Sequence, residues 1–273
     1  MSSFYLVGSA RDRPLLEWPE ATVPGAAVAV TTRHGGVSVG PYASLNLGMH
    51  VGDQPERVLA NRQRAAHAFG VELDDMVFAE QVHGARATVV GAADRGRGTR
   101  SMDGAIAATD ILVTTEAAVV LVMLIADCVP LALIDTEARV LAVVHAGWRG
   151  TAAGAVARAI EAMGHMGGRA ARTVALMGPA VDPDRYQVDD TVRRGLASAT
   201  APHELDPDVA RGDGPDHWRV DLAAANRQQL ELAGVPPAQI IGWGKSTSHD
   251  DFFSDRAARP CGRFALMAQL LAS

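Results

Sequence analysis

The chain has 273 residues, of which 48% are hydrophobic and 21% charged, and its formal net charge is -6 at pH 7 with neutral histidines. This composition is typical of a water-soluble globular protein, and the negative balance excludes a general attraction to nucleic acid or anionic lipid. The longest apolar run, residues 117–126, ends at Asp127 and falls well short of the roughly 20 residues that a membrane-spanning helix needs.

The N-terminus shows no basic start followed by an apolar stretch, so we find no signal peptide and expect a cytoplasmic protein. The two cysteines, Cys128 and Cys261, do not make a disulfide framework. We further expect a small-molecule substrate, no nucleic-acid or membrane partner, and a monomer or small homo-oligomer.

The first part of the chain alternates apolar runs with glycine-rich loops. Residues 53–70 predict a helix, which Asp53 caps, Pro55 begins and Gly70 ends. Strands are predicted at 26–33, 76–81 and 86–91, the last two forming a pair joined by the turn "VHGA". Loops are predicted at 34–53 and 93–104.

Four short apolar runs then follow, "DILVTT", "AVVLVMLIA", "PLALID" and "VLAVVH", and their lengths favour buried strands. Further strands are predicted at "TVALMG" and "AQIIGWG", helices at 151–164, 184–198 and 221–234, and a loop at 200–218. The C-terminal tail fits either a strand or a helix. Strands with interspersed helices predict a layered α+β or α/β protein, which we take as one domain over 1–273.

Three reactive side chains stand at the ends of apolar runs: His83, Cys128 and His145. Taken singly, Cys128 also fits a buried core thiol and His83 a capping or surface role. The spacings are too long for local sequence to bring the three together, so only the tertiary structure can do so. Two imidazoles and one thiolate would give zinc three protein ligands and leave a fourth position open, as catalytic zinc requires.

Two arginines stand beside glycines at the ends of predicted strands. Arg149 lies between Gly147 and Gly150 before a predicted helix, where free N–H groups and a cation favour an anion. Arg33 precedes "HGG", where two glycines let the backbone approach a ligand closely, but by itself this stretch favours an ordinary turn with a surface arginine. Trp148 fits both a packing residue and a stacking surface for a base.

Several of these motifs occur together in one order. The stretches are "TTRHGGVSVGPYASLNLGMHVGD", "NR" at 61–62, "QVHG", "ADCVPLALID", "HAGWRG" and "GPA…YQV". From about Ala26 to Phe264 the chain therefore resembles the YfiH-like family, also called the laccase-domain or polyphenol oxidoreductase family.

The resemblance implies a zinc-binding active centre made of His83, Cys128 and His145. It implies a layered α/β/β/α sandwich with mixed sheets, related to putative cysteine hydrolases of the cytotoxic necrotizing factor type. It also implies purine nucleoside chemistry, namely phosphorolysis of adenosine, inosine, guanosine and S-methyl-5'-thioadenosine, and hydrolytic deamination of adenosine. For such a reaction we expect Arg33 and Arg149 to hold phosphate and Asn46 to bind ribose or phosphate.

The C-terminal region departs from the family pattern of a "CT" pair followed by "FFSYRRDG-TGR". The departures are Ser246, Asp255, Ala257 and Cys261, while Arg256, Gly262 and Arg263 keep the family residue. If this region contributes to the pocket, these departures bear on the range of substrates. Cys261 replaces a threonine and is not expected to be a ligand.

The name laccase conflicts with the histidine pattern. The chain has nine histidines but no His-x-His pair, so the clustered sites of a multicopper oxidase are missing. A single His₂Cys site can hold copper, but it cannot carry out four-electron oxygen reduction.

Two further functions stay open beside the zinc enzyme and a copper-dependent polyphenol oxidase. One is a cysteine hydrolase in which His145 activates Cys128, with peptidoglycan-precursor editing, the removal of misincorporated L-Ser from UDP-MurNAc-L-Ser, as its reaction. The other is a nucleotide-binding protein without turnover.

Overall fold

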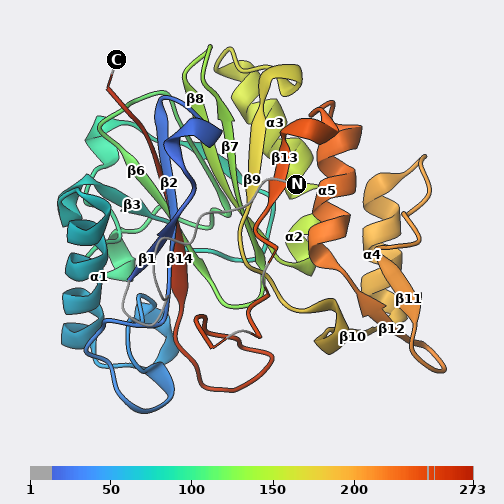
Figure 1. Cartoon of the computed structure of the whole chain (residues 1–273), viewed down its shortest axis with the longest axis horizontal. Helices are drawn as coiled ribbons and strands as arrows, with labels where there is room; N and C mark the ends of the chain where they lie inside the picture. Colours follow the sequence, from blue (N-terminus) through green and yellow to red (C-terminus); the bar gives the residue numbers. More distant parts are fainter. Residues whose placement is uncertain (1–13, 245, 249, 273) are drawn as a thin grey trace.

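The computed structural model describes residues 14–244, 246–248 and 250–272. Two mixed β-sheets pack face to face, and helices cover their outer faces (Figure 1). The five-stranded sheet has the order β1 (Leu15–Glu17), β2 (Ala26–Thr31), β14 (Phe264–Leu270), β6 (Val120–Ile125), β3 (Met76–Phe78). The six-stranded sheet has the order β13 (Ile240–Gly242), β9 (Val174–Met177), β7 (Val129–Asp135), β8 (Val140–Ala146), β5 (Ile111–Thr114), β4 (Ala87–Val89).

The helices lie on opposite sides of the two sheets. On the five-stranded sheet lies α1 (Pro55–Phe69). On the six-stranded sheet lie α2 (Trp148–Ala152), α3 (Ala155–His165) and α5 (Leu222–Leu232). Beyond them, α4 (Asp190–Thr200) joins a small antiparallel sheet of β10 (Gln187–Asp189), β12 (His217–Val220) and β11 (Ala210–Gly212). The predicted mixed α+β class is thereby confirmed, with layers in the order helix, sheet, sheet, helix.

The continuous apolar runs are explained by strands that are buried on both faces. Every residue of β6, β7 and β8 is buried. In β6, Leu121, Met123 and Ile125 belong to the core between the sheets, while the alternating residues Val120, Val122 and Leu124 belong to the core under α1. This alternation follows from the two-residue period of a strand. No described helix combines the length and apolar character that crossing a membrane demands.

The predicted pairing of 76–81 with 86–91 is wrong. β3 runs parallel to β6 in one sheet, and β4 runs parallel to β5 in the other. The "VHGA" stretch is therefore a connection between sheets, because the buried strands β6 and β5 offer the better partners for burial.

Other element boundaries also differ from those predicted. The predicted helix 151–164 is two helices, separated at Gly154, whose φ of 77° is left-handed. The predicted helix 184–198 begins only at Asp190, since residues 187–189 form β10. The predicted loop 200–218 contains β11 and the start of β12. The C-terminal tail is β14, in the middle of the five-stranded sheet between β2 and β6.

Candidate metal centre

The chain passes from one sheet to the other at four places, and three of these connections line one cavity. The three connections are 79–86 between β3 and β4, 126–128 between β6 and β7, and the described part of 243–263 between β13 and β14. The cavity has a volume of about 710 Å³, which is within the range of small-molecule sites. The ends of the two sheets therefore form the walls of the site.

His83, Cys128 and His145 meet at this cavity. His83 lies on the first connection, Cys128 ends the second, and His145 is the last residue but one of β8. Antiparallel pairing sets Pro130 opposite His145. Cys128 precedes Pro130 by two residues and therefore lies at the same end of this strand pair as His145. One ligand atom from each side chain lies within 4.8 Å of the others. The structure thus brings together residues that are 45 and 17 positions apart.

Asp110 holds the His145 imidazole and the backbone at His83 in place, and sequence reasoning missed it. Its Oδ1 accepts the His145 Nδ1–H at 2.8 Å and the His83 backbone N–H at 3.0 Å. Its Oδ2 accepts the Gly84 N–H at 2.7 Å and the Val82 N–H at 3.2 Å. Because Nδ1 of His145 donates to the carboxylate, its Nε2 is free to bind a metal, as in the common carboxylate–histidine–metal arrangement.

Two further residues, Gln81 and Gly147, determine how closely the segments around His83 and Cys128 approach their neighbours. The Gln81 side-chain amide both donates to the Leu124 carbonyl and accepts from the Leu124 N–H, each at 2.8 Å. The Gln81 side chain thus continues the pairing of β3 with β6 by two hydrogen bonds, and it fixes the backbone two residues before His83. Gly147 leaves room for the ligands, since a Cβ there would lie 2.6 Å from the Cys128 Sγ.

The electrostatics favour a thiolate beside an imidazolium when no metal is considered. Burial alone would raise the pKa of Cys128, but His145 and His83 lower it to about 6. Burial alone would lower the pKa of His145, but Cys128 and Asp110 raise it to about 9. Both shifts describe the same pair. A thiolate at neutral pH is the form of cysteine that binds metal or attacks a substrate.

The donor set fits a metal ion on chemical grounds. Two imidazoles and a thiolate are ligands that zinc prefers, and three protein ligands leave a coordination position open. The same donors accept copper. Among the described residues, this is the one cluster of three or more histidine, cysteine or carboxylate side chains close enough to hold a metal.

The other predicted site residues lie at different distances from the cavity. Arg149 and Trp148 line it, with the guanidinium stacked 4.5 Å from the indole centre. Arg33 is not among the lining residues. Its side chain donates to the Ala43 carbonyl and stacks on Phe253.

Asn46 is fully buried, also outside the cavity lining, and its Oδ1 accepts the N–H of Arg263 at 2.8 Å. In these positions Arg33 and Asn46 support the loops around the site.

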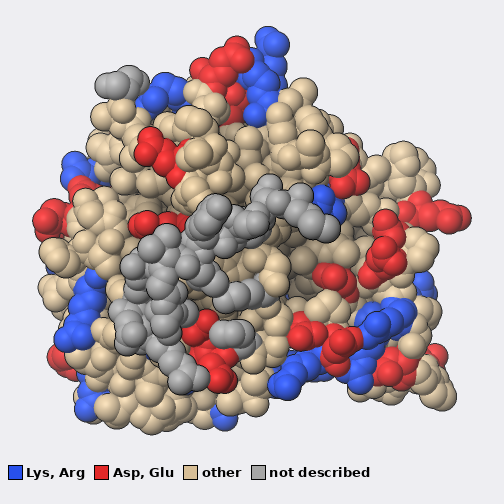
Figure 2. Space-filling model, in the orientation of Figure 1, with Lys and Arg blue, Asp and Glu red and all other residues tan. Residues whose placement is uncertain are grey.

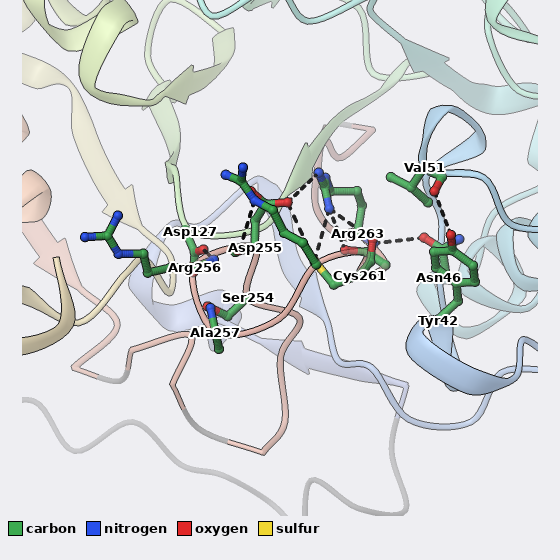
Figure 3. A network of polar contacts seen from close by, with 12 residues as sticks. Tyr42, Asn46, Val51, Asp127, Ser254, Asp255, Arg256, Ala257, Cys261 and Arg263 are labelled. Atoms are coloured by element: carbon green, nitrogen blue, oxygen red, sulfur yellow. Dashed lines mark hydrogen bonds and ion pairs between the residues drawn. The ribbon is translucent and has the colours of Figure 1, made fainter.

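The C-terminal arm, defined as residues 246–248 and 250–263, closes one side of the cavity. Asp255 pairs with Arg263 at 3.3 Å and with Arg259 at 2.5 Å (Figure 3 shows the pair with Arg263). Asp127, whose φ of 86° is left-handed, accepts the backbone N–H of Arg256 at 2.6 Å. The arm is thereby attached to the residue that precedes Cys128.

Residues 27–271 match the family described as multi-copper polyphenol oxidoreductase laccase. The chain belongs to this family. A purine nucleoside phosphorylase of Corynebacterium glutamicum is 46% identical over 237 residues, which are 86% of this chain and 90% of the relative. The adenosine deaminase RL5 from an unknown prokaryotic organism is 37% identical over 238 residues, again 86% and 90% of the two chains.

The laccase-domain family also supplies a close structural relative. The crystal structure of YlmD from Geobacillus stearothermophilus superposes with a TM-score of 0.93 and 35% identity, covering 99% of this chain and 100% of that chain. By sequence, that relative is a purine nucleoside phosphorylase, 39% identical over 240 residues, which are 86% of either chain. The likeness supports an enzyme acting on purine nucleosides.

The face of the molecule in Figure 2 carries its charges in small groups of both signs. On the face in Figure 2, basic and acidic side chains are interspersed, and outside the grey residues no broad basic area is seen. Such a mixed distribution gives this face no extended field of one sign that would attract a large charged partner.

Proposed function

We propose that the chain is a zinc-dependent purine nucleoside enzyme. It cleaves adenosine, inosine, guanosine and S-methyl-5'-thioadenosine with phosphate, and it deaminates adenosine with water. The convergence of His83, Cys128 and His145 at the cavity carries the proposal. The names of the relatives, purine nucleoside phosphorylase and adenosine deaminase, support the choice of substrate.

The reactions balance as follows. In phosphorolysis an oxygen of hydrogen phosphate bonds to the ribose C1', the bond from C1' to the purine breaks with its electron pair on the purine nitrogen, and the proton of hydrogen phosphate ends on the purine. In deamination water adds at C6 of adenine and ammonia leaves. Zinc, when bound, would supply a Lewis acid at the centre.

The chain's own residues have distinct tasks in this proposal. His83, Cys128 and His145 hold the metal, and Asp110 keeps the His145 ring in the orientation that presents Nε2. Arg149 faces the cavity as a cation for phosphate. Arg33 and Asn46 take a supporting part, since their side chains hold neighbouring loops.

Product analysis tests the proposal. Purified wild type is incubated with adenosine, with and without phosphate, and adenine, ribose 1-phosphate and inosine are measured. We expect phosphate-dependent adenine, phosphate-independent inosine, and loss of both in Cys128→Ala. Elemental analysis of wild type and His145→Ala is expected to show zinc in the first and its loss in the second. Wild-type activity in Cys128→Ala would refute the proposal.

A cysteine hydrolase is the second candidate, because Cys128, His145 and Asp110 form a connected chain of the kind that activates a thiol nucleophile. Editing of UDP-MurNAc-L-Ser is the reaction proposed for it, and the relation of the fold to cysteine hydrolases remains a prediction. Release of serine that survives a chelator, with one equivalent of iodoacetamide abolishing it, would favour this candidate over the zinc enzyme.

A further inference from the structure

Three hydrogen-bond donors line the same cavity as Cys128 and belong to separate segments. Arg149 lies at the start of α2, Tyr186 directly precedes β10, and Arg256 belongs to the C-terminal arm. The Arg256 guanidinium stacks 5.5 Å from the centre of the Tyr186 ring. All three donors thus line the one cavity that also holds His83, Cys128 and His145.

Within the part of the chain that the structure describes, neither arginine has a carboxylate partner and the tyrosine hydroxyl has no hydrogen-bond partner. Arg149 contacts the Trp148 ring and has no carboxylate partner there. The side chain of Arg256 donates to the carbonyls of Arg185 and Gln187, which carry no charge. The Tyr186 hydroxyl has no described hydrogen-bond partner. Burial raises the pKa of Tyr186 to about 12, so this hydroxyl keeps its proton and can donate it.

The other arginines of the cavity differ in this respect. Arg259 and Arg263 both pair with Asp255, so each of them has a carboxylate partner. In Figure 3 the Arg263 side chain lies against the Asp255 carboxylate, whereas the Arg256 side chain extends away from this carboxylate. Two cations without carboxylate partners in one cavity repel each other and strongly favour an anion between them.

We propose that Arg149, Tyr186 and Arg256 form the binding site for the phosphate that attacks the ribose, beside the metal centre. This inference rests on the proposed function. The ligand class is a tetrahedral oxyanion, with inorganic phosphate as the occupant. The three donors hold it and set one of its oxygens toward C1' of the nucleoside, and the bonds made and broken are those of the phosphorolysis above.

Deamination gives an internal control, because water rather than phosphate is its co-substrate. In Tyr186→Phe, Arg149→Gln and Arg256→Gln we expect the KM for phosphate in inosine phosphorolysis to rise roughly tenfold to hundredfold, the usual effect of losing a hydrogen bond to a charged group. We expect the KM for inosine, and adenosine deamination in phosphate-free buffer, to change much less than the KM for phosphate does in the same variant. Arg256→Gln keeps the backbone N–H that binds Asp127.

Arg185→Gln is the matched control. It removes the same charge one residue from Tyr186, but Arg185 does not line the main cavity. Its KM for phosphate should equal that of wild type. Isothermal titration of inorganic phosphate into wild type and Tyr186→Phe reads the site directly, and binding should weaken in the variant.

The outcomes separate this inference from the proposed function. If wild type makes no phosphate-dependent product, the proposed function fails, while the titration still tests for the anion site. If the KM for phosphate is unchanged in all three variants, or if deamination falls in parallel, the phosphate site is refuted. If titration shows that the variants weaken the binding of adenosine 5'-monophosphate and leave the binding of inorganic phosphate unchanged, the anion site serves a nucleotide and the assignment to the attacking phosphate is wrong.

Discussion

Replacing Asp110 by asparagine tests how the metal centre is built. Both carboxylate oxygens are in use: His83 and His145 donate to Oδ1, and Val82 and Gly84 donate to Oδ2. An asparagine amide has one acceptor oxygen, so either orientation loses two of the four hydrogen bonds and sets an NH₂ group against two donors.

The magnitude follows from the number of bonds lost. Hydrogen bonds to a charged group contribute about 1.5–3 kcal/mol each, so Asp110→Asn should lower the free energy of unfolding by roughly 3–6 kcal/mol. Against a typical stability of about 5–15 kcal/mol the variant should still fold, with a lower denaturation midpoint. Because the His145 ring loses its charged acceptor, and in one amide orientation loses the hydrogen bond itself, zinc affinity should fall by about 10- to 100-fold.

The assay is competition for zinc with a chromophoric chelator, combined with urea unfolding. Asp135→Asn is the matched control, since Asp135 is equally buried and accepts several hydrogen bonds but lies at the far end of β7 from Cys128. It should lose stability and keep its zinc affinity. Unchanged zinc affinity in Asp110→Asn, or equal losses in both variants, would show that Asp110 does not orient the ligands.

The pH dependence of Asp110→Asn has a defined sign. Burial alone would raise the pKa of Asp110, but its bonds with His145 and backbone amides hold this pKa below its usual value. A carboxyl with a lowered pKa stabilises the folded state above its unfolded pKa, and this contribution is lost as the pH falls through the folded value. The difference in stability between wild type and variant should therefore narrow below about pH 4, and a constant difference would contradict the assignment.

Three other predictions concern the same site. Gly147→Ala should abolish zinc binding with little change in secondary structure, since its Cβ would collide with the Cys128 sulfur; zinc content and circular dichroism check this. In metal-free protein, iodoacetamide should modify Cys128 with a rate that rises through about pH 6, well before Cys261, whose pKa is raised by burial; peptide mass mapping distinguishes the two cysteines. Asp127→Ala should raise the KM for nucleoside more than it lowers zinc content, because it removes both carboxylate oxygens that bind the arm at Thr247 and Arg256; wild-type kinetics would contradict this.

The candidate ligands were suggested by sequence because His83, Cys128 and His145 follow apolar runs, which is a local signal. Taken singly, Cys128 and His83 also fitted structural roles, and it was the family resemblance that grouped the three. Asp110 stands at the start of a buried strand and carries a related signal, but its partners are 26 to 35 positions away in the chain. Such pairing depends on which strands become neighbours, and local sequence does not determine that.

The direction in which a side chain points was the second feature that could not be predicted from the sequence. Arg33 and Asn46 stand in motifs close to the site, and proximity in a motif suggested contact with substrate. Their side chains instead satisfy backbone groups of the loops around them. In contrast, Tyr186 and Arg256 are far from the ligand motifs in sequence but line the cavity, because the connections between the sheets converge there.

The position of β14 has a consequence for the synthesis of the protein. All three candidate ligands lie within residues 83–145, yet the strand that separates β2 from β6 is made from residues 264–270. A nascent chain that already carries His83, Cys128 and His145 therefore still has a gap in the middle of one sheet, and an open side where the arm belongs. Because chains emerge from the N-terminus, the five-stranded sheet beside the cavity can be completed only after residues 264–270 have been synthesised, and losing these residues would remove a central strand.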